Sequence, residues 1–487
     1  MREIKHKRLI LFNFKKYFNN TFILYSVSTI CIILIVLSIL KNPDQNIPAH
    51  PDEPNVVETA IRISDGSFNP EFFRYPSGHM NILAIIYKVS GYFNPEQTKE
   101  DYYFIARAFS RLCIAGISAM VFIICSMNMS SYFSILASVL TIFSTTLYTN
   151  ANFVLVDIPM ALFITLFFFI VTTLYSNNVW QLKYIILLAF ITGVAISMKY
   201  TAALLIPSLI FVSVEYVQKQ KKNIIPIIQL KKGLLIIGNS LFIISIITII
   251  MQEALLEYFT GFTTDGILEI EYIRTLSNFS SLIMIAGILL IIFSLRDKLV
   301  KNEWVGFIFS PFHIFTIFIL IIGFAIFSPF TLIEYKKSFA DFMYEYRHMK
   351  IGSAAQYHHL SDEYKNIISN LSSTASGIFY MNLIYRNLGI IGIIISIYGF
   401  YHMYLRNPAY SITILIYLVL LLFTLLTWKN YAVRYAFSIF PIMIVFITHG
   451  LLIIYQKLSQ KYSYRYSIAI FLYIIVLIHP ISNLINQ

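Results

Sequence analysis

Charged residues are scarce in this sequence. Only 12% of the 487 residues are Asp, Glu, Lys or Arg, whereas 58% are hydrophobic, and the mean hydropathy is +0.72. This composition excludes a water-soluble domain built around one core, because apolar runs of about 18 residues or more recur along the chain. The sequence therefore predicts a polytopic membrane protein.

Cysteine is also rare, and no cleavage site follows the first apolar run. Cys31, Cys113 and Cys125 lie in apolar runs without metal-type spacing, so we expect buried thiols and no redox chemistry. The run that begins near Thr21 lacks the small residues of a signal-peptidase site and is interpreted as a retained span. With no repeat, low-complexity linker or appended soluble domain, residues 1–487 are expected to form one membrane domain.

Apolar runs with the length of a transmembrane helix recur about 13 times. We therefore predict an all-α fold with the following spans: 22–40, 104–125, 132–150, 154–175, 184–198, 200–217, 233–251, 278–295, 307–327, 387–405, 409–427, 432–455 and 466–485.

The net charge of +12 comes from basic residues clustered between apolar runs, which is typical of cytoplasmic loops and not of nucleic-acid binding. The basic segment before the first span places the N-terminus in the cytoplasm. A shorter apolar stretch, 79–93, carries Lys88 and is expected to lie in the membrane interface. If it crossed the membrane, the later basic clusters would lie on the outer face, against the positive-inside rule. The C-terminus is then periplasmic or extracellular.

Three external segments follow from this orientation: 41–103, 252–277 and 328–380. They hold most of the chain's 24 carboxylates. The working surface is therefore expected on the outer face of the membrane.

Asp52 and Glu53 lie between Pro51 and Pro54 in the first external segment. The prolines restrict the local backbone and hold both carboxylates near the membrane face. A carboxylate positioned there can act as a general base toward an acceptor hydroxyl, while its neighbour orients the acceptor or binds a metal. The alternative is an ordinary solvated loop.

Asp157 is expected one turn inside the apolar run that begins near Phe153. An ionised side chain there is costly unless it faces partners or a water-filled cavity, so a functional role is favoured. The alternative is a helix N-cap at the membrane interface.

Cations and aromatics recur at the same membrane face. Arg74 and Tyr75 follow two phenylalanines, and the motif is either an interface anchor or a cradle for a lipid phosphate. Further cations at external helix ends are either snorkelling side chains or ligands of a departing phosphate: Arg107, Arg111, Lys199 and Arg434.

Three external histidines, His348, His358 and His359, do not have the spacing of a metal motif. We assign no metal ligand, and a divalent metal cofactor is left open.

Several segments occur in an order that is similar to one enzyme family: HPDEPN, FFRYPSGHMNIL, ARAFSRL, VLVDIPMALF, SMKYTAALLIP, FSPFTLIEYKKSF and NYAVRYAFSIFP. Through this set the chain resembles the C-type glycosyltransferase superfamily, specifically family 39, which includes protein O-mannosyltransferases and lipid A aminoarabinose transferases. The resemblance implies a C-type glycosyltransferase fold, Asp52 as catalytic base beside Glu53, and Asp157 as a second active-site carboxylate. It also implies a polyprenyl-phosphate-linked sugar donor and transfer on the periplasmic or lumenal face.

The chain departs from the family at Tyr75, where aminoarabinose transferases carry a lysine. Arg74 then replaces that phosphate contact or the contact is missing. Because no lumenal or C-terminal domain is evident, acceptor recognition falls to 252–277 and 328–380, and the acceptor is a lipid, a glycan or a protein.

The sequence thus predicts an inverting membrane glycosyltransferase. The Ile, Asn and Lys bias indicates the plasma membrane of a bacterium with an AT-rich genome. Two alternatives stay open: a transporter or flippase for a lipid-linked sugar, and a polysaccharide polymerase. The sugar, the acceptor and the oligomeric state are not given by the sequence.

Overall fold

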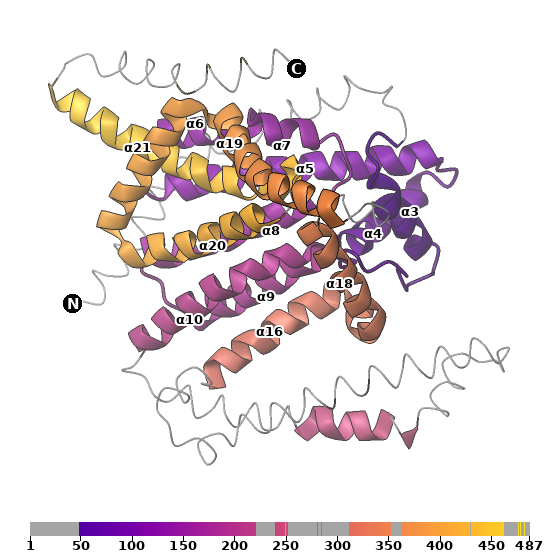
Figure 1. Cartoon of the computed structure of the whole chain (residues 1–487). Helices are drawn as coiled ribbons and strands as arrows, with labels where there is room; N and C mark the ends of the chain where they lie inside the picture. Colours follow the sequence, from indigo (N-terminus) through magenta and orange to yellow (C-terminus); the bar gives the residue numbers. More distant parts are fainter. Residues whose placement is uncertain are drawn as a thin grey trace. The chain divides into compact units, whose positions relative to one another are not determined.

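The computed structural model describes residues 48–220, 239–248, 250–251, 311–351, 362–428 and 430–461, together with the single residues 280, 284, 476, 478 and 482. Every regular element among them is a helix (Figure 1). The predicted all-α fold is therefore confirmed.

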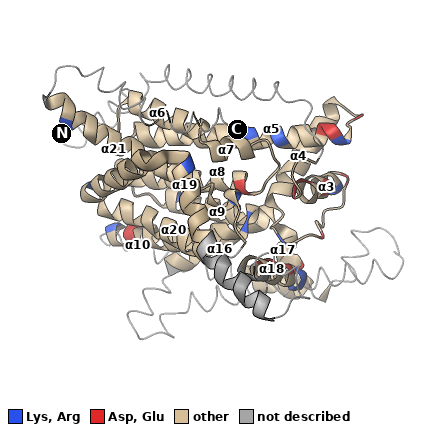
Figure 2. Ribbon diagram, turned by 45° about the horizontal axis from the view of Figure 1, so that its top comes forward, with Lys and Arg blue, Asp and Glu red and all other residues tan. Residues whose placement is uncertain are grey.

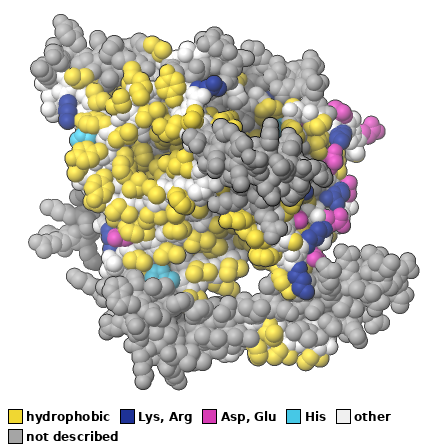
Figure 3. Space-filling model, viewed as in Figure 1, with side chains coloured by type: hydrophobic (Ala, Val, Ile, Leu, Met, Phe, Trp, Pro, Cys, Tyr) yellow, Lys and Arg dark blue, Asp and Glu magenta, His cyan; other side chains and the backbone are white. Residues whose placement is uncertain are grey.

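Six helical segments in this part of the chain are long and apolar enough to cross a membrane. They are α5 (Lys99–Ser126), α8 (Asp157–Ser176), the segment Tyr200–Gln220 made of η1 (Tyr200–Leu205) and α10 (Ile206–Gln220), the segment Ser376–Arg406 of α19 (Asp362–Arg406), α20 (Pro408–Thr427), and Ile439–Gln460 of α21 (Ile439–Lys461). Their middle portions carry few charged residues (Figure 2), and hydrophobic side chains cover much of the face seen in Figure 3. The chain is a multi-pass membrane protein.

Shorter apolar helices include α9 (Leu182–Met198) and α16 (Pro311–Phe327), which occupy two further predicted spans. The predicted spans 22–40, 278–295 and 466–485 fall wholly or almost wholly outside the described residues. Of the span predicted over 233–251, the structure describes the helix Asn239–Thr248. The total of about 13 spans therefore stays a prediction.

The single helix predicted over 132–150 is instead two helices, α6 (Ser131–Ile142) and α7 (Thr145–Asn150). The break follows from polar residues inside the apolar run. The Asn387 Oδ1 atom accepts hydrogen bonds from the Ser144 hydroxyl and from the Thr146 backbone N–H, both at 3.0 Å. These bonds anchor the start of α7 to α19.

The chain forms two compact units. Unit 1 takes its described residues from Met1–Val57, Asn94–Asn178 and Gly352–Gln487, and contains α5 to α8, α19, α20, η3 (Val433–Ala436) and α21. In it α5 packs on α6 and α8, and α19 packs on α20 and α21.

Glycines allow α19 and α21 to approach closely. A Cβ atom at Gly399 would overlap the backbone oxygen of Phe446, and one at Gly450 would overlap the backbone oxygen of Ile395. Small residues at such crossings are typical of membrane helices, because lipid offers no hydrophobic driving force and close backbone packing must supply the attraction.

Unit 2 takes its described residues from Glu58–Phe93 and Val179–Ile351. Helix α9 packs on α16, η1 and α10, and α4 (Gly78–Phe93) packs on α9 and α16. Gly193 and Gly323 form the corresponding close crossing of α9 and α16. The short helix α17 (Pro329–Ile333) leads into α18 (Tyr335–Ile351).

Helices were expected in the first external segment, and α3 (Glu53–Ser64) and α4 are found there. The 16-residue α4 is not among the helices of the described chain that are long and apolar enough to span. Its interfacial position stays a prediction.

Candidate active site

The acidic pair Asp52 and Glu53 stands at a tight turn that opens α3. The Glu53 backbone N–H donates to the His50 carbonyl at 3.1 Å, and the Asp52 backbone N–H donates to His50 Nδ1 at 3.1 Å. Pro54 falls in the first helical turn, where no intrahelical N–H bond is lost. The turn directs the two neighbouring carboxylates to different partners.

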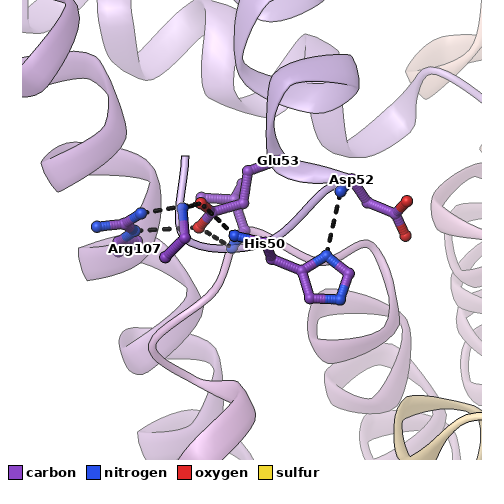
Figure 4. A network of polar contacts seen from close by, with 6 residues as sticks. His50, Asp52, Glu53 and Arg107 are labelled. Carbon is purple, nitrogen blue, oxygen red and sulfur yellow. Dashed lines mark hydrogen bonds and ion pairs between the residues drawn. The ribbon is translucent and has the colours of Figure 1, made fainter. Parts of the chain in front are cut away.

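Glu53 is fully buried and its carboxylate is saturated with hydrogen bonds (Figure 4). Arg107 of α5 donates from Nε to Oε1 at 3.0 Å and from Nη2 to Oε2 at 2.8 Å. The backbone N–H of Val154 donates to Oε1 at 3.0 Å, and those of Ala49 and His50 donate to Oε2 at 2.9 and 3.3 Å. Glu53 thus ties the acidic turn to α5 and to the segment before α8.

These bonds also control the ionisation of Glu53. Burial alone would raise the pKa of this carboxyl group, but the hydrogen bonds and positive charge of Arg107 outweigh burial, with help from the Val154 and Ala49 N–H groups. The net effect is a lowered pKa. Glu53 is therefore ionised at neutral pH.

Asp52 remains partly accessible. Its side chain is 25% exposed, and its Oδ2 atom accepts a hydrogen bond from Nη1 of Arg434, which lies in η3 and has a 16% exposed side chain. The structure thus brings together two residues that are 382 positions apart in the chain. A carboxylate with a free side and a guanidinium beside it can interact with both a hydroxyl and a phosphate.

His50 belongs to the same cluster, although no role was predicted for it. Its ring packs on Phe153 with centroids 5.5 Å apart. Burial, followed by the positive charge of Arg434, lowers the pKa of His50 below its usual value. The carboxylates of Asp52, Glu53 and Asp157 oppose this lowering, so all three act on the ring.

Asp157 is the first residue of α8 and is only 2% exposed. It was expected one turn inside the helix. The helix begins later than the apolar run because Val154 and its neighbours form the segment that binds Glu53. The N-cap position is held by Val156, so Asp157 is not the N-cap, and its charge lies in the positive end of the helix dipole.

Arg111 lies one turn beyond Arg107 on α5 and contacts a different partner. Its Nε and Nη2 atoms donate to Asn152 Oδ1 at 3.1 and 2.6 Å. Arg107 is neutralised by a carboxylate, whereas Arg111 is held by a neutral amide and has no ion-pair partner among the described residues.

Asn152 and His50 are the residues that sequence reasoning missed. His50 stands within the HPDEPN motif, which could have pointed to it, but Asn152 gave no signal.

Unit 2 holds the remaining predicted phosphate ligands in one cluster. The Arg74 guanidinium stacks over the Tyr344 ring at 4.6 Å, and the Lys199 Nζ atom lies 5.7 Å from the Tyr75 ring centre. The Phe73 N–H donates to Asp341 at 3.0 Å. The residues before α4 thus contact α18 and also η1, whose Tyr200 hydroxyl donates to the Phe73 carbonyl at 3.2 Å. Lys199 is 7% exposed.

No group of three His, Cys, Asp or Glu residues in the described chain is arranged to hold a metal ion. His348 lies on α18, whereas His358 and His359 are outside the described residues. Cys113 and Cys125 are buried free thiols.

The sequence model of one protein family matches residues 85–262 of this chain, and its description is dolichyl-phosphate-mannose-protein mannosyltransferase. No curated protein sequence matches the chain. The fold defines a multi-pass helical membrane protein, and the match confirms its resemblance to the glycosyltransferases of family 39.

Solved structures similar to this chain include the oligosaccharyltransferase of Archaeoglobus fulgidus with zinc and sulfate (11% identity, 94% of this chain and 52% of the other, TM-score 0.47). The same enzyme with an inhibitory peptide and a dolichol-phosphate gives 12% identity, 96% and 56% coverage, and TM-score 0.47. ArnT from Cupriavidus metallidurans gives 10% identity, 89% and 80% coverage, and TM-score 0.32. This chain spans about half the length of the oligosaccharyltransferase.

Proposed function

We propose that this protein is a membrane glycosyltransferase that moves a sugar from a polyprenyl-phosphate donor to an acceptor hydroxyl. The observation that carries the proposal is the pairing of a partly exposed carboxylate, Asp52, with Arg434 beside the saturated Glu53. The family match over residues 85–262 supports the reaction class. The predicted external position of the acidic segment, opposite the predicted basic cytoplasmic loops, supports transfer on the outer face of a bacterial plasma membrane.

The proposed reaction is a single displacement. Asp52 takes the proton of the acceptor hydroxyl, and the acceptor oxygen forms a bond to the anomeric carbon as the bond from that carbon to the phosphate oxygen breaks. Polyprenyl phosphate leaves with the electron pair, so the configuration is inverted. Phosphate is a good leaving group, and no general acid is required.

The cations of the site divide into two roles in this proposal. Arg434 and Arg111 attract the donor phosphate, because Arg434 has a partly exposed guanidinium and Arg111 has no carboxylate partner among the described residues. Arg107 and Glu53 act as positioning residues, since each satisfies the other. Asp157 stabilises positive charge near the reacting centre. Arg74, Tyr75 and Lys199 were predicted from the sequence as further phosphate contacts, and for these three residues the assignment stays a prediction.

The proposal is tested by incubating the purified full chain with a panel of polyprenyl-phosphate sugars and with peptide, lipid and glycan acceptors. Released polyprenyl phosphate is measured. We expect Asp52→Asn to lower release about 10²-fold or more, the typical contribution of a general base. The control Asp65→Asn, which removes an exposed carboxylate, should leave the rate unchanged.

Three outcomes would contradict the proposal. Wild-type activity in folded Asp52→Asn protein would remove Asp52 as the base. No release from any donor would favour a transporter, and products with many added sugars would favour a polymerase.

A further inference from the structure

A second polar site lies in unit 1 at the far end of α8 from Asp157. It is a pocket of about 160 Å³ where the ends of α5 and α8, the junction of α19 with α20, and the middle of α21 meet. Helix α8 has 20 residues, so this pocket is about 30 Å from Asp157 along the helix axis. It is therefore separate from the candidate active site.

The side chains that line this pocket include hydrogen-bond donors and no carboxylate. Arg406, the last residue of α19, has an exposed guanidinium and no ion-pair partner in the described part of the chain. His449 of α21 is only 4% exposed, and its ring makes no hydrogen bond to any described residue. A buried imidazole without a partner is costly unless a ligand or water satisfies it.

Neutral polar groups complete the lining. Asn407 caps α20 by accepting a hydrogen bond from the Tyr410 N–H at 3.2 Å, and this leaves its amide nitrogen available as a donor. Asn128 and Ser176 hydrogen-bond to each other at 2.9 Å. The start of the 20-residue α20 adds the positive end of a helix dipole. The Asn407 amide nitrogen and the helix dipole of α20 both favour an anion.

The distribution of basic residues indicates which side of the membrane this pocket faces. Lys457, two turns beyond His449 on α21, belongs to a segment that the positive-inside rule assigns to the cytoplasm. A guanidinium at the cytoplasmic end of membrane helices lies at the level of lipid headgroups. The anion available there in quantity is the phosphate of a phospholipid.

We propose that this pocket binds a phosphate group, and that an anionic phospholipid of the cytoplasmic leaflet supplies it. Arg406 contacts the phosphate oxygens, with His449 and Asn407 as the deeper hydrogen-bond partners. The lipid tails then lie along the apolar surfaces of the neighbouring helices. This site does not depend on the proposed glycosyltransferase activity.

The test is native mass spectrometry of the full-length protein with added phosphatidylglycerol, or with diacylglycerol of the same chains, which lacks the phosphate. We expect phosphatidylglycerol to be retained and diacylglycerol not. Arg406→Gln should lower retention about tenfold, the effect of losing one hydrogen bond to a charged group. The control Lys457→Gln removes a cation that donates to the Tyr398 hydroxyl at 2.9 Å, outside the pocket lining, and should retain the lipid.

A binding measurement with inorganic phosphate tells whether the phosphate group comes from a lipid headgroup or from free phosphate. Binding of inorganic phosphate alone, lost in Arg406→Gln, would keep the phosphate site and overturn the lipid source. Equal retention of phosphatidylglycerol by wild type and Arg406→Gln, or equal retention of diacylglycerol, would overturn the site. An unchanged unfolding temperature of Arg406→Gln confirms that the comparison is between folded proteins.

Discussion

Glu53 and Arg107 form a two-pronged ion pair that is almost closed to solvent. The side chains of Glu53 and Arg107 are 0% and 10% exposed, and the two nitrogen-to-oxygen distances are 3.0 and 2.8 Å. Such a pair contributes little net stability over an apolar replacement, but the loss of one partner leaves a buried charge without compensation. Removal of either partner is therefore expected to destabilise unit 1.

Arg107→Gln should lower the free energy of unfolding by about 3–5 kcal/mol, because Glu53 would keep its charge and lose its counterion. The measurement is denaturant unfolding of the detergent-solubilised protein. The control is Arg62→Gln, which breaks a 3.2 Å ion pair with Glu71 whose side chains are 45% and 60% exposed. That change should cost about 0–1 kcal/mol. Equal losses in the two variants would contradict the special role of the buried pair.

Acidification should destabilise the protein in a way that depends on His50. The pKa of His50 is lowered in the folded chain from an ordinary value of 6.5, so the fold favours the neutral ring. Its contribution to stability is complete above pH 6.5 and is lost as the pH falls through the lowered folded pKa. Glu53, whose pKa is lowered from 4.5, adds a loss at lower pH.

The measurement is the unfolding temperature of wild type and His50→Asn between pH 8 and pH 4. Asn offers an oxygen near the Nδ1 position that accepts from Asp52, and it does not titrate. We expect the fall in unfolding temperature just below pH 6.5 to be smaller in His50→Asn. Identical pH profiles would show that His50 does not contribute.

Arg434→Gln should raise the KM for the donor about tenfold, because one hydrogen bond from a charged group to the phosphate is lost. The rate at saturating donor should also fall, since Arg434 orients Asp52. Steady-state kinetics with varied donor concentration separates the two effects. Lys457→Gln is the charge-matched control. An unchanged KM with a lowered rate would limit Arg434 to positioning the base.

Gly399→Ala should destabilise the protein by about 1–3 kcal/mol, the usual cost of an added methyl group in a closely packed site. The new Cβ would overlap the backbone oxygen of Phe446, which cannot move without shifting α21. Gly377→Ala on the same helix is the control, because the nearest atom to its Cβ would be a Leu426 methyl at 3.6 Å. If the two alanine variants unfold at the same denaturant concentration, the close crossing is not required.

The apolar runs predicted most of the helices of the described chain, because a bilayer demands long apolar segments and leaves little freedom in their length. The split between α6 and α7 could not be predicted, since it depends on Asn387, which is distant in sequence. The hydrophobic periodicity also does not predict the close crossing at Gly399 and Gly450, because it does not show which helix packs against which.

At the candidate site, too, contacts between residues distant in sequence could not be predicted, and the acidic pair is the example. Residue types identified Asp52, Glu53, Asp157 and the cations, and the structure gathers Asp52, Glu53, Arg107 and Arg434 around one turn. The sequence could not predict which of the two adjacent carboxylates is buried in an ion pair and which stays partly exposed. This depends on which one meets Arg107 and the Val154 N–H, and those partners are 54 and 101 residues away.

The carboxylate of Glu53 joins backbone groups of the acidic turn, a guanidinium of α5 and the segment before α8. The turn that carries Asp52 therefore has its shape only when those helices are already packed. If Asp52 acts as the proposed base, activity requires a correctly packed bundle. A chain inserted in the membrane with α5 or α8 misplaced would have all the residues of the site but would not present the Asp52 carboxylate correctly.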